Sequence, residues 1–170
     1  MLNYKSVNKL LGLGPLILLY YLSISEVDSH FENYFEILSF NIQLIIIYFW
    51  VSKKPESLGS GHIFLAGLIN DVVMGVPLGL SSLSYLVVSL VATYVKNMTV
   101  NTRITTDMFT FFIAIFFSNI TFYILISNFS DIQISITEIS YNTFFTLIFF
   151  PFFWFIFSYY NAIIMSGKNA

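Results

Sequence analysis

The sequence predicts an all-α fold, a polytopic integral membrane bundle of six transmembrane helices, and three observations lead to this prediction. First, only 9% of the 170 residues are charged and 57% are hydrophobic, whereas a soluble domain carries about 25% charged residues. Second, the apolar residues gather in six runs separated by polar breaks. Third, the basic residues all fall on one side of a six-pass arrangement. So few charges cannot cover a water-facing surface, and we therefore expect the chain in a lipid bilayer.

The six apolar runs cover approximately residues 10–24, 35–51, 63–74, 80–95, 108–126 and 143–160. A helix needs about 20 residues, with a range of roughly 17–25, to cross a bilayer. The fifth and sixth runs reach this length, and the second does so marginally. The first, third and fourth runs are shorter, so we expect flanking residues, local thinning or burial within the bundle to compensate. The loops are too short for a separate folded domain, which predicts a single transmembrane domain over residues 1–170.

The first run, 10–24, follows Lys5 and Lys9. A basic start before a short apolar run is also typical of a cleavable signal peptide. However, Gly14 and Pro15 within the run resemble helix-packing and kink positions of a transmembrane helix. We therefore expect this run to be retained as the first span.

The distribution of charge predicts the topology. In a six-pass arrangement, all seven basic residues lie on the side of the two termini: Lys5, Lys9, Lys53, Lys54, Lys96, Arg103 and Lys168. Six of the nine acidic residues lie on the opposite side: Glu26, Asp28, Glu32, Glu36, Asp131 and Glu138. Cytoplasmic loops carry an excess of Lys and Arg. The bias therefore predicts an N-in, C-in protein, whereas five spans would place Lys168 outside.

The third run contains a carboxylate, Asp71, at its centre. Asp71 lies nine residues after His62, so a helix rising about 1.5 Å per residue places it roughly 13 Å deep, near the middle of a ~30 Å hydrocarbon core. Gly67, Asp71 and Gly75 are four residues apart and share one helix face, where small residues allow a neighbouring helix to approach closely.

Two roles are open for this carboxylate. A charged side chain at this depth costs about 3 kcal/mol on insertion scales, and such residues often form a proton or substrate site. The other role is structural, with Asp71 held by hydroxyl groups or a backbone N–H. The serines at positions 81, 82 and 84 are candidate partners. Apart from Glu36 at the start of the second run, no other charged residue falls within the six runs, which favours the structural role.

The segment Gly75-Val-Pro77-Leu-Gly79 predicts a break between the third and fourth runs. Proline fixes φ and lacks an N–H group, and glycine tolerates positive φ. No Lys-Ser or Lys-Thr pair follows the glycines, so the segment does not indicate a phosphate-binding loop. We expect the chain to reverse here and return as the fourth run.

The sixth run is dense in aromatic residues around Pro151, which predicts a kink. The side chains of residues 149–154 cover most of the circumference of this helix, and we expect most of them to face lipid. A sharper interpretation is a helix-docking face formed by Phe150, Pro151 and Trp154, because bulky side chains at a kink offer adaptable contact area.

The sequence contains no pattern that indicates catalysis. It has no cysteine, which excludes disulfides and thiolate metal sites. Its two histidines, His30 and His62, fall on opposite faces of the predicted bundle and cannot share a metal. No Ser-His-Asp set or HExxH motif appears, and seven scattered basic residues do not suit nucleic-acid binding. We therefore expect no enzymatic activity, cofactor, metal or nucleic-acid partner.

The residues of the third run and the following break carry a resemblance to a known family. The pattern Phe64-x-x-Gly67-Leu-x-x-Asp71-x-x-x-Gly75-x-Pro77-Leu-Gly79 resembles the signature of the MreD family of bacterial rod-shape-determining membrane proteins. The chain length and number of spans also fit that family. Asn70 departs from the pattern, because the family usually has an apolar residue there.

This resemblance implies a function. MreD-like proteins are non-enzymatic components of the elongasome in the bacterial inner membrane, where they support lateral peptidoglycan synthesis and rod cell shape. They bind MreC, a single-span scaffold, and through it connect to the MreB filament, RodA and a class-B penicillin-binding protein. The resemblance also implies a fold similar to the substrate-binding subunits of energy-coupling-factor transporters. It assigns no reaction to Asp71.

A second function remains open, that of a small-molecule (vitamin-like) substrate-binding subunit of a membrane transporter. It rests on the fold similarity, the Asn70–Asp71 pair and the serines of the fourth run. This function predicts a closed outward pocket lined by several convergent polar groups. A cavity filled only by aromatic side chains would favour the scaffold.

Overall fold

Helices make up the regular secondary structure of the residues that the structure, a computed structural model, describes: 11–25, 40–98, 103–130 and 135–166. Six α-helices follow one another in these segments: α2 (Gly14–Ile24), α3 (Ile42–Lys53), α4 (Ser60–Met74), α5 (Leu80–Met98), α6 (Ile104–Phe129) and α7 (Ile136–Ser166). A short 3₁₀ helix, η2 (Pro55–Ser57), connects α3 to α4. The predicted all-α fold is confirmed for the described part of the chain.

Each predicted apolar run corresponds to one helix, although the boundaries differ. Residues 35–39 of the second run lie outside the described residues, and α3 begins only after Asn41, whose side-chain oxygen accepts a hydrogen bond from the Leu44 N–H at 3.1 Å. The largest difference is in α7, which has 31 residues instead of the predicted 18-residue span 143–160. Ser140 lies in this extension, and its hydroxyl donates to the Ile136 carbonyl one turn back in the same helix. Such a residue is compatible with a helix although it lowers the hydropathy.

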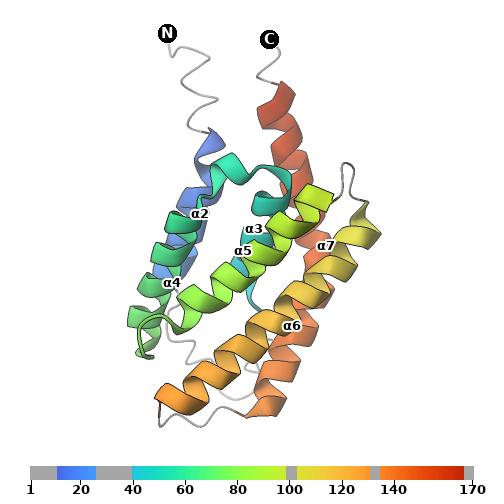
Figure 1. Cartoon of the computed structure of the whole chain (residues 1–170). Helices are drawn as coiled ribbons and strands as arrows, with labels where there is room; N and C mark the ends of the chain where they lie inside the picture. The colour runs from blue at the N-terminus through green and yellow to red at the C-terminus, as the bar shows by residue number, and fades with distance from the viewer. Residues whose placement is uncertain (1–10, 26–39, 99–102, 131–134, 167–170) are drawn as a thin grey trace.

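Consecutive helices run in alternating directions, so the start of α2 and the end of α7 lie at the same end of the bundle (Figure 1). The Tyr160 hydroxyl in α7 donates to the Leu11 carbonyl at 2.8 Å and ties these ends together. Gly14 makes room for this contact, since a Cβ atom there would overlap the Tyr160 hydroxyl. The alternation agrees with an even number of passes.

Helix α3 occupies the centre of the bundle. Every residue from Gln43 to Ser52 is buried, and α3 contacts α2, α5, α6 and α7. A helix that is apolar on all sides is stable where other helices surround it. Its 12 residues therefore need not match the length of the outer helices.

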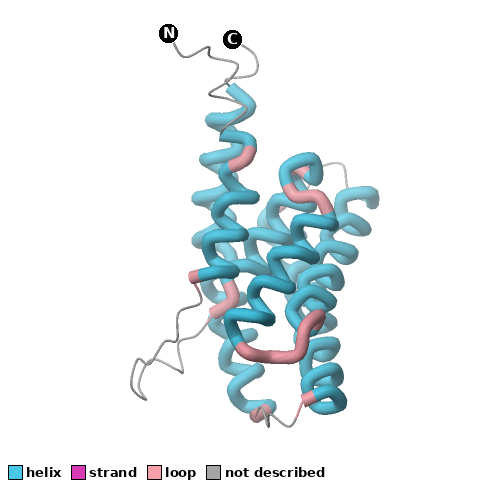
Figure 2. Tube along the Cα trace, turned by 90° about the vertical axis from the view of Figure 1, so that its left-hand side faces the viewer, coloured by secondary structure: helices cyan, strands magenta, loops and turns pink. Residues whose placement is uncertain are grey.

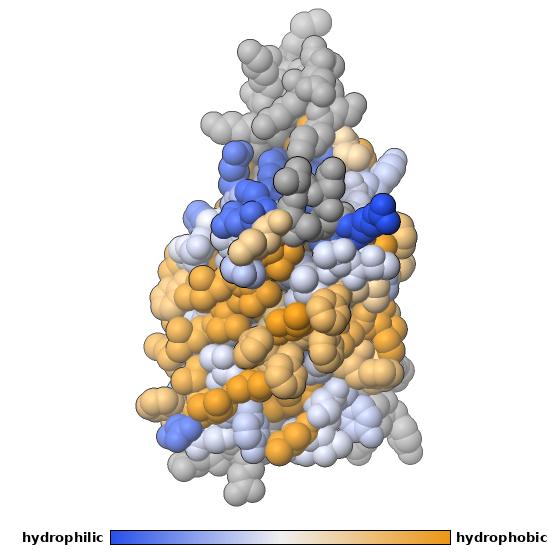
Figure 3. Space-filling model, turned by 45° about the vertical axis from the view of Figure 1, so that its right-hand side comes forward, coloured by the Kyte–Doolittle hydropathy of each residue, from blue (hydrophilic) through white to orange (hydrophobic). Residues whose placement is uncertain are grey.

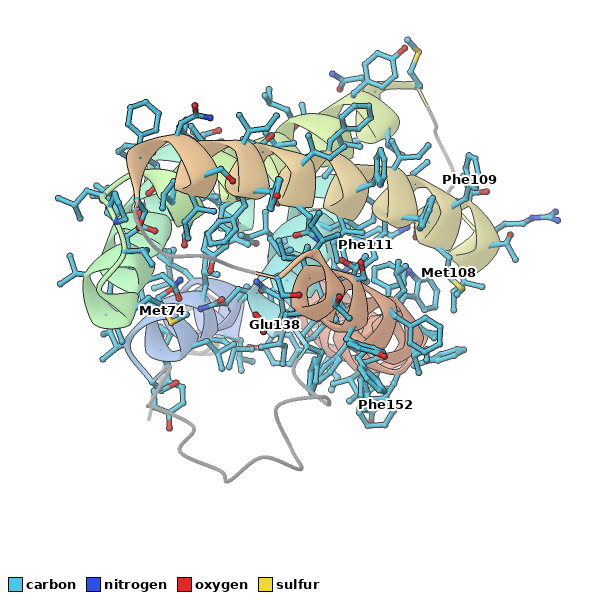
Figure 4. All side chains as sticks on the ribbon, turned by 90° about the horizontal axis from the view of Figure 1, so that it is seen from below. Met74, Met108, Phe109, Phe111, Glu138 and Phe152 are labelled. Carbon is cyan, nitrogen blue, oxygen red and sulfur yellow. The ribbon has the colours of Figure 1, made fainter. Side chains whose placement is uncertain are left out.

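An aromatic cluster joins α3, α6 and α7. The Phe111 ring of α6 stacks on the Phe150 ring of α7 with centroids 4.3 Å apart, and Tyr48 of α3 contacts both rings edge-on. Helix α7 continues through Pro151. Seen from below, Phe111 points between α6 and α7, whereas Phe109 and Phe152 point outward (Figure 4).

The outer surface carries a broad apolar belt, with hydrophilic residues gathered mainly toward the end that holds the termini (Figure 3). Two helices of the described chain, Ile104–Phe129 and the Ile136–Ile164 part of α7, are long and apolar enough to cross a membrane. Only 28% and 17% of their most apolar windows are buried inside the bundle. A core helix of a soluble protein would be mostly buried, and these two helices are not.

Candidate functional site

The Asp71 carboxylate links the end of α4 to the start of α5. Its side chain is fully buried, and its two oxygens accept hydrogen bonds from the backbone N–H groups of Gly79 at 2.7 Å and Ser81 at 2.8 Å. The first N–H groups of a helix have no partner within that helix, and a negative charge near them is stabilising. These contacts favour the structural role, and Asp71 makes them with backbone N–H groups rather than with the serine hydroxyls that we considered.

The turn between α4 and α5 forms as the glycines and proline predict (Figure 2). Gly75 ends α4 in the left-handed region with φ of 67°, and Gly79 has φ of 103°. The Val76 N–H reaches back to the Asp71 carbonyl at 3.1 Å, which is the bond that defines a Schellman motif. The predicted break is thus a helix C-cap followed directly by the segment that Asp71 binds.

Replacing Gly75 with alanine tests this cap. We expect the free energy of unfolding to fall by about 1 kcal/mol, because a Cβ atom is disfavoured in the left-handed region, although no atom lies within 4 Å of the added carbon. Gly59→Ala is the matched control, since Gly59 has φ of −70° and precedes α4. Denaturant titration of the purified proteins in micelles measures both; equal stability of the two variants would contradict the prediction.

Gly67 allows α4 and α5 to touch. A Cβ atom at Gly67 would lie 2.6 Å from the backbone nitrogen of Ser82 and closer still to its Cα. The Ser82 hydroxyl donates to the Phe64 carbonyl at 3.0 Å across this contact. Gly67 and Asp71 therefore share the face that packs on α5, as predicted, whereas Gly75 lies just past the end of α4.

A buried polar network continues from this hairpin into the centre of the bundle. The Asn70 side chain donates to the Ser81 hydroxyl and accepts from the Gln43 amide of α3, both at 3.1 Å. The Gln43 oxygen in turn accepts from the Tyr85 hydroxyl at 2.5 Å. Sequence reasoning missed Gln43, and the available signal was an amide side chain inside the second apolar run.

A cavity of about 330 Å³ lies beside this network, toward the end of the bundle opposite the termini. Four asparagines, three serines, a tyrosine and a glutamate supply the polar part of its lining: Asn41, Asn70, Asn119, Asn142, Ser81, Ser84, Ser118, Tyr85 and Glu138. The remaining residues are Leu44, Met74, Val76, Phe122 and Ile139. Figure 4 views this end from below and shows Met74 and Glu138, which come from α4 and α7. None of the described residues that line the cavity is basic.

A second buried charge, Asp107, lies near the other end of the bundle. Asp107, which precedes the fifth apolar run, falls in the first turn of α6 and is fully buried. One of its carboxylate oxygens accepts from the Lys53 ammonium at 2.8 Å and from the Trp154 indole N–H at 2.9 Å. Three helices, α3, α6 and α7, thus meet at one carboxylate.

The same contacts show where the residues of the expected docking face lie. Trp154 points to Asp107, and the Phe150 side chain is only 1% exposed. Phe150 therefore packs within the bundle instead of facing outward, whereas Trp154 is partly buried and its indole N–H is bonded to Asp107. Pro151 is partly buried between them.

The described residues contain no group of three or more His, Asp or Glu side chains that could hold a metal ion. His62 is exposed, and its ring lies 3.1 Å from the Tyr20 hydroxyl, while His30 lies outside the described residues. Comparisons of the chain with known protein families, curated proteins and solved structures find no match. The fold and site therefore define a helical bundle in which the capped hairpin of α4 and α5 lies beside a polar cavity.

Proposed function

We propose that this chain is a multi-pass protein of the bacterial inner membrane, with six spans and an N-in, C-in topology. In this proposal it is an MreD-like, non-enzymatic component of the elongasome that binds MreC and so supports lateral peptidoglycan synthesis and rod cell shape. The hairpin of α4 and α5 is the observation that supports this proposal most. Four residues of the MreD-like signature each have a distinct structural role in this hairpin: Gly67, Asp71, Gly75 and Gly79.

The polarity of α5 supports a lipid environment. Its serines at positions 81, 82, 84 and 89 are buried, whereas Leu83 is 43% and Leu90 69% exposed. In water this pattern would expose apolar surface and bury polar groups, the reverse of the usual preference. In a bilayer it is favourable, because small polar residues join helices and leucine faces lipid. The exposed faces of α6 and α7 fit the same environment.

A scaffold role agrees with the use of the two buried carboxylates. Asp71 binds two backbone N–H groups, and Asp107 binds Lys53 and Trp154. Both carboxylates therefore hold helices together, which suits a protein that presents a surface to MreC and, through it, to MreB, RodA and a class-B penicillin-binding protein.

Replacing Asp71 with alanine tests this function. We expect the variant to accumulate less and to lose co-purification with MreC, since two N–H groups at the start of α5 lose their acceptor, at about 1–3 kcal/mol each. The readouts are immunoblot abundance, recovery of tagged MreC, and cell shape on complementation in rod-shaped bacteria. Glu56→Ala is the control, because Glu56 is exposed in η2. Normal abundance, MreC binding and rod shape in Asp71→Ala cells would count against the proposal.

A second candidate function is a small-molecule-binding subunit of a membrane transporter. The polar cavity favours it, because convergent amide and hydroxyl groups line the cavity instead of a filling of aromatic rings. The two functions differ in the partner that they require. Identification of proteins that co-elute with the wild-type chain separates them: MreC supports the scaffold, and a coupling protein supports the transporter.

A further inference from the structure

We propose that the polar cavity and an apolar groove next to it form one binding site for a neutral glycolipid. The hydroxyl-rich head would occupy the cavity, and an acyl chain would occupy the groove. This inference rests on the proposed membrane location and goes beyond the proposed scaffold function. The groove, of about 440 Å³, lies between α6 and α7, and apolar side chains such as Phe112, Phe116, Ile120, Phe144 and Leu147 make up most of its lining.

The cavity and the groove adjoin each other. Asn119 of α6 and Ile139 of α7 line both of them. The Asn119 amide also donates to the Thr143 hydroxyl at 2.5 Å, so it is held in place between the two helices. Polar lining on one side of these residues and apolar lining on the other fit a ligand that has a polar and an apolar part.

The lining of the cavity selects the head group. Among the described residues that line the cavity, Glu138 is the only charged one and none is basic, so the cavity disfavours a phosphate or carboxylate head. Amides and hydroxyls both donate and accept hydrogen bonds, which matches the hydroxyls of a sugar. Ser84 is 4% exposed, and its Oγ has no hydrogen-bond partner among the described residues. A buried hydroxyl without a partner is destabilising, and a hydrogen bond from a sugar hydroxyl would offset this cost.

The groove has the dimensions and surroundings of a site for one chain of a lipid. From Phe112 to Tyr123 it follows α6 for roughly 17 Å at 1.5 Å per residue, which is about half of a ~30 Å hydrocarbon core. Phe116 is 52% and Phe144 58% exposed on its two walls. The groove therefore opens sideways, where an acyl chain of one leaflet can enter without leaving the bilayer.

The test uses the full chain in lipid nanodiscs. The protein is purified in a detergent without a sugar head and reconstituted in phosphatidylglycerol that contains a minor fraction of glucosyl-diacylglycerol. Native mass spectrometry then compares the lipids that remain bound with the bulk composition. We expect enrichment of the glycolipid over phosphatidylglycerol, and no binding of methyl glucoside, which has the sugar without the chain.

Two variants test the assignment of the two halves. Ser84→Ala is expected to reduce the enrichment about five- to tenfold, as the loss of one hydrogen bond implies, while thermal stability in the absence of glycolipid stays equal or rises. Asn119→Leu is expected to abolish the enrichment. Thr121→Leu is the matched control on α6, because Thr121 lines neither the cavity nor the groove and bonds to its own helix at Phe117.

Each alternative result overturns a defined part of the inference. Equal retention of both lipids would overturn the neutral head, and binding of methyl glucoside as tight as that of the glycolipid would overturn the groove. No retained lipid, or unchanged enrichment in Ser84→Ala, would overturn the site as a whole. Failure of the chain to incorporate into nanodiscs would instead contradict the proposed membrane protein, which keeps the two failures distinct.

Discussion

Replacing Gly67 with alanine is expected to force α4 away from α5 and to lower the free energy of unfolding by about 3 kcal/mol or more. The added Cβ would lie 2.6 Å from the Ser82 backbone nitrogen, and a backbone atom of a helix cannot move without its neighbours. The separation would also weaken the Ser82–Phe64 hydrogen bond across the same contact. Titration with a denaturing detergent, monitored by tryptophan fluorescence or circular dichroism, measures the change.

Gly61→Ala is the matched control for Gly67→Ala. Both glycines lie in α4, but a Cβ at Gly61 meets no atom within 4 Å. Because alanine is favoured over glycine in a helix by roughly 1 kcal/mol, Gly61→Ala is expected to keep or raise stability. If Gly67→Ala is as stable as Gly61→Ala, α4 and α5 do not approach each other as closely as the structure shows. The packing role of Gly67 in the MreD-like signature would then also be wrong.

The hairpin of α4 and α5 was predictable because its determinants are local in the sequence. Gly75, Pro77 and Gly79 specify a break through backbone conformation alone, and the spacing of Gly67 and Asp71 places them on one face. The acceptor role of Asp71 depends on which α5 groups lie next to it after the chain reverses. The spacing does not contain that detail, so serine hydroxyls and backbone N–H groups were both candidates until the fold placed Gly79 and Ser81 at the carboxylate.

The contacts that sequence reasoning missed join distant parts of the chain. Gln43 and Asn70 are 27 residues apart, and Asp107 and Trp154 are 47 apart. Hydropathy shows that each segment is apolar but does not give the rotation of each helix about its axis. The sequence alone therefore suggested that Trp154 faces outward, and it did not show that α3 is buried on all sides. The polar cavity depends on five helices and the connections between them, so no single run could reveal it.

Asn70 connects the hairpin of α4 and α5 to α3 at the centre of the bundle. It departs from the apolar residue of the resembling signature, and it is also the residue that joins the hairpin to Gln43 and lines the cavity. A buried amide requires partners, and here it has one on α3 and one on α5. The departure of Asn70 from the MreD-like signature is thus matched by polar partners elsewhere in the chain, Gln43 and Ser81.

The second large effect is expected at the buried ion pair. Lys53→Met should lower the free energy of unfolding by about 3–5 kcal/mol, because it leaves a buried carboxylate without its cation. Asp107→Asn should cost less: the Lys53 side chain is 21% exposed and can extend to solvent, whereas that of Asp107 is 1% exposed, and the amide oxygen can still accept from Trp154. The double variant should recover much of the loss, which gives a coupling energy in a double-mutant cycle.

Lys54→Met, which removes the same charge one residue later, is the control. Additive effects in the cycle would mean that the two side chains do not interact, and the junction of α3, α6 and α7 at Asp107 would have to be abandoned.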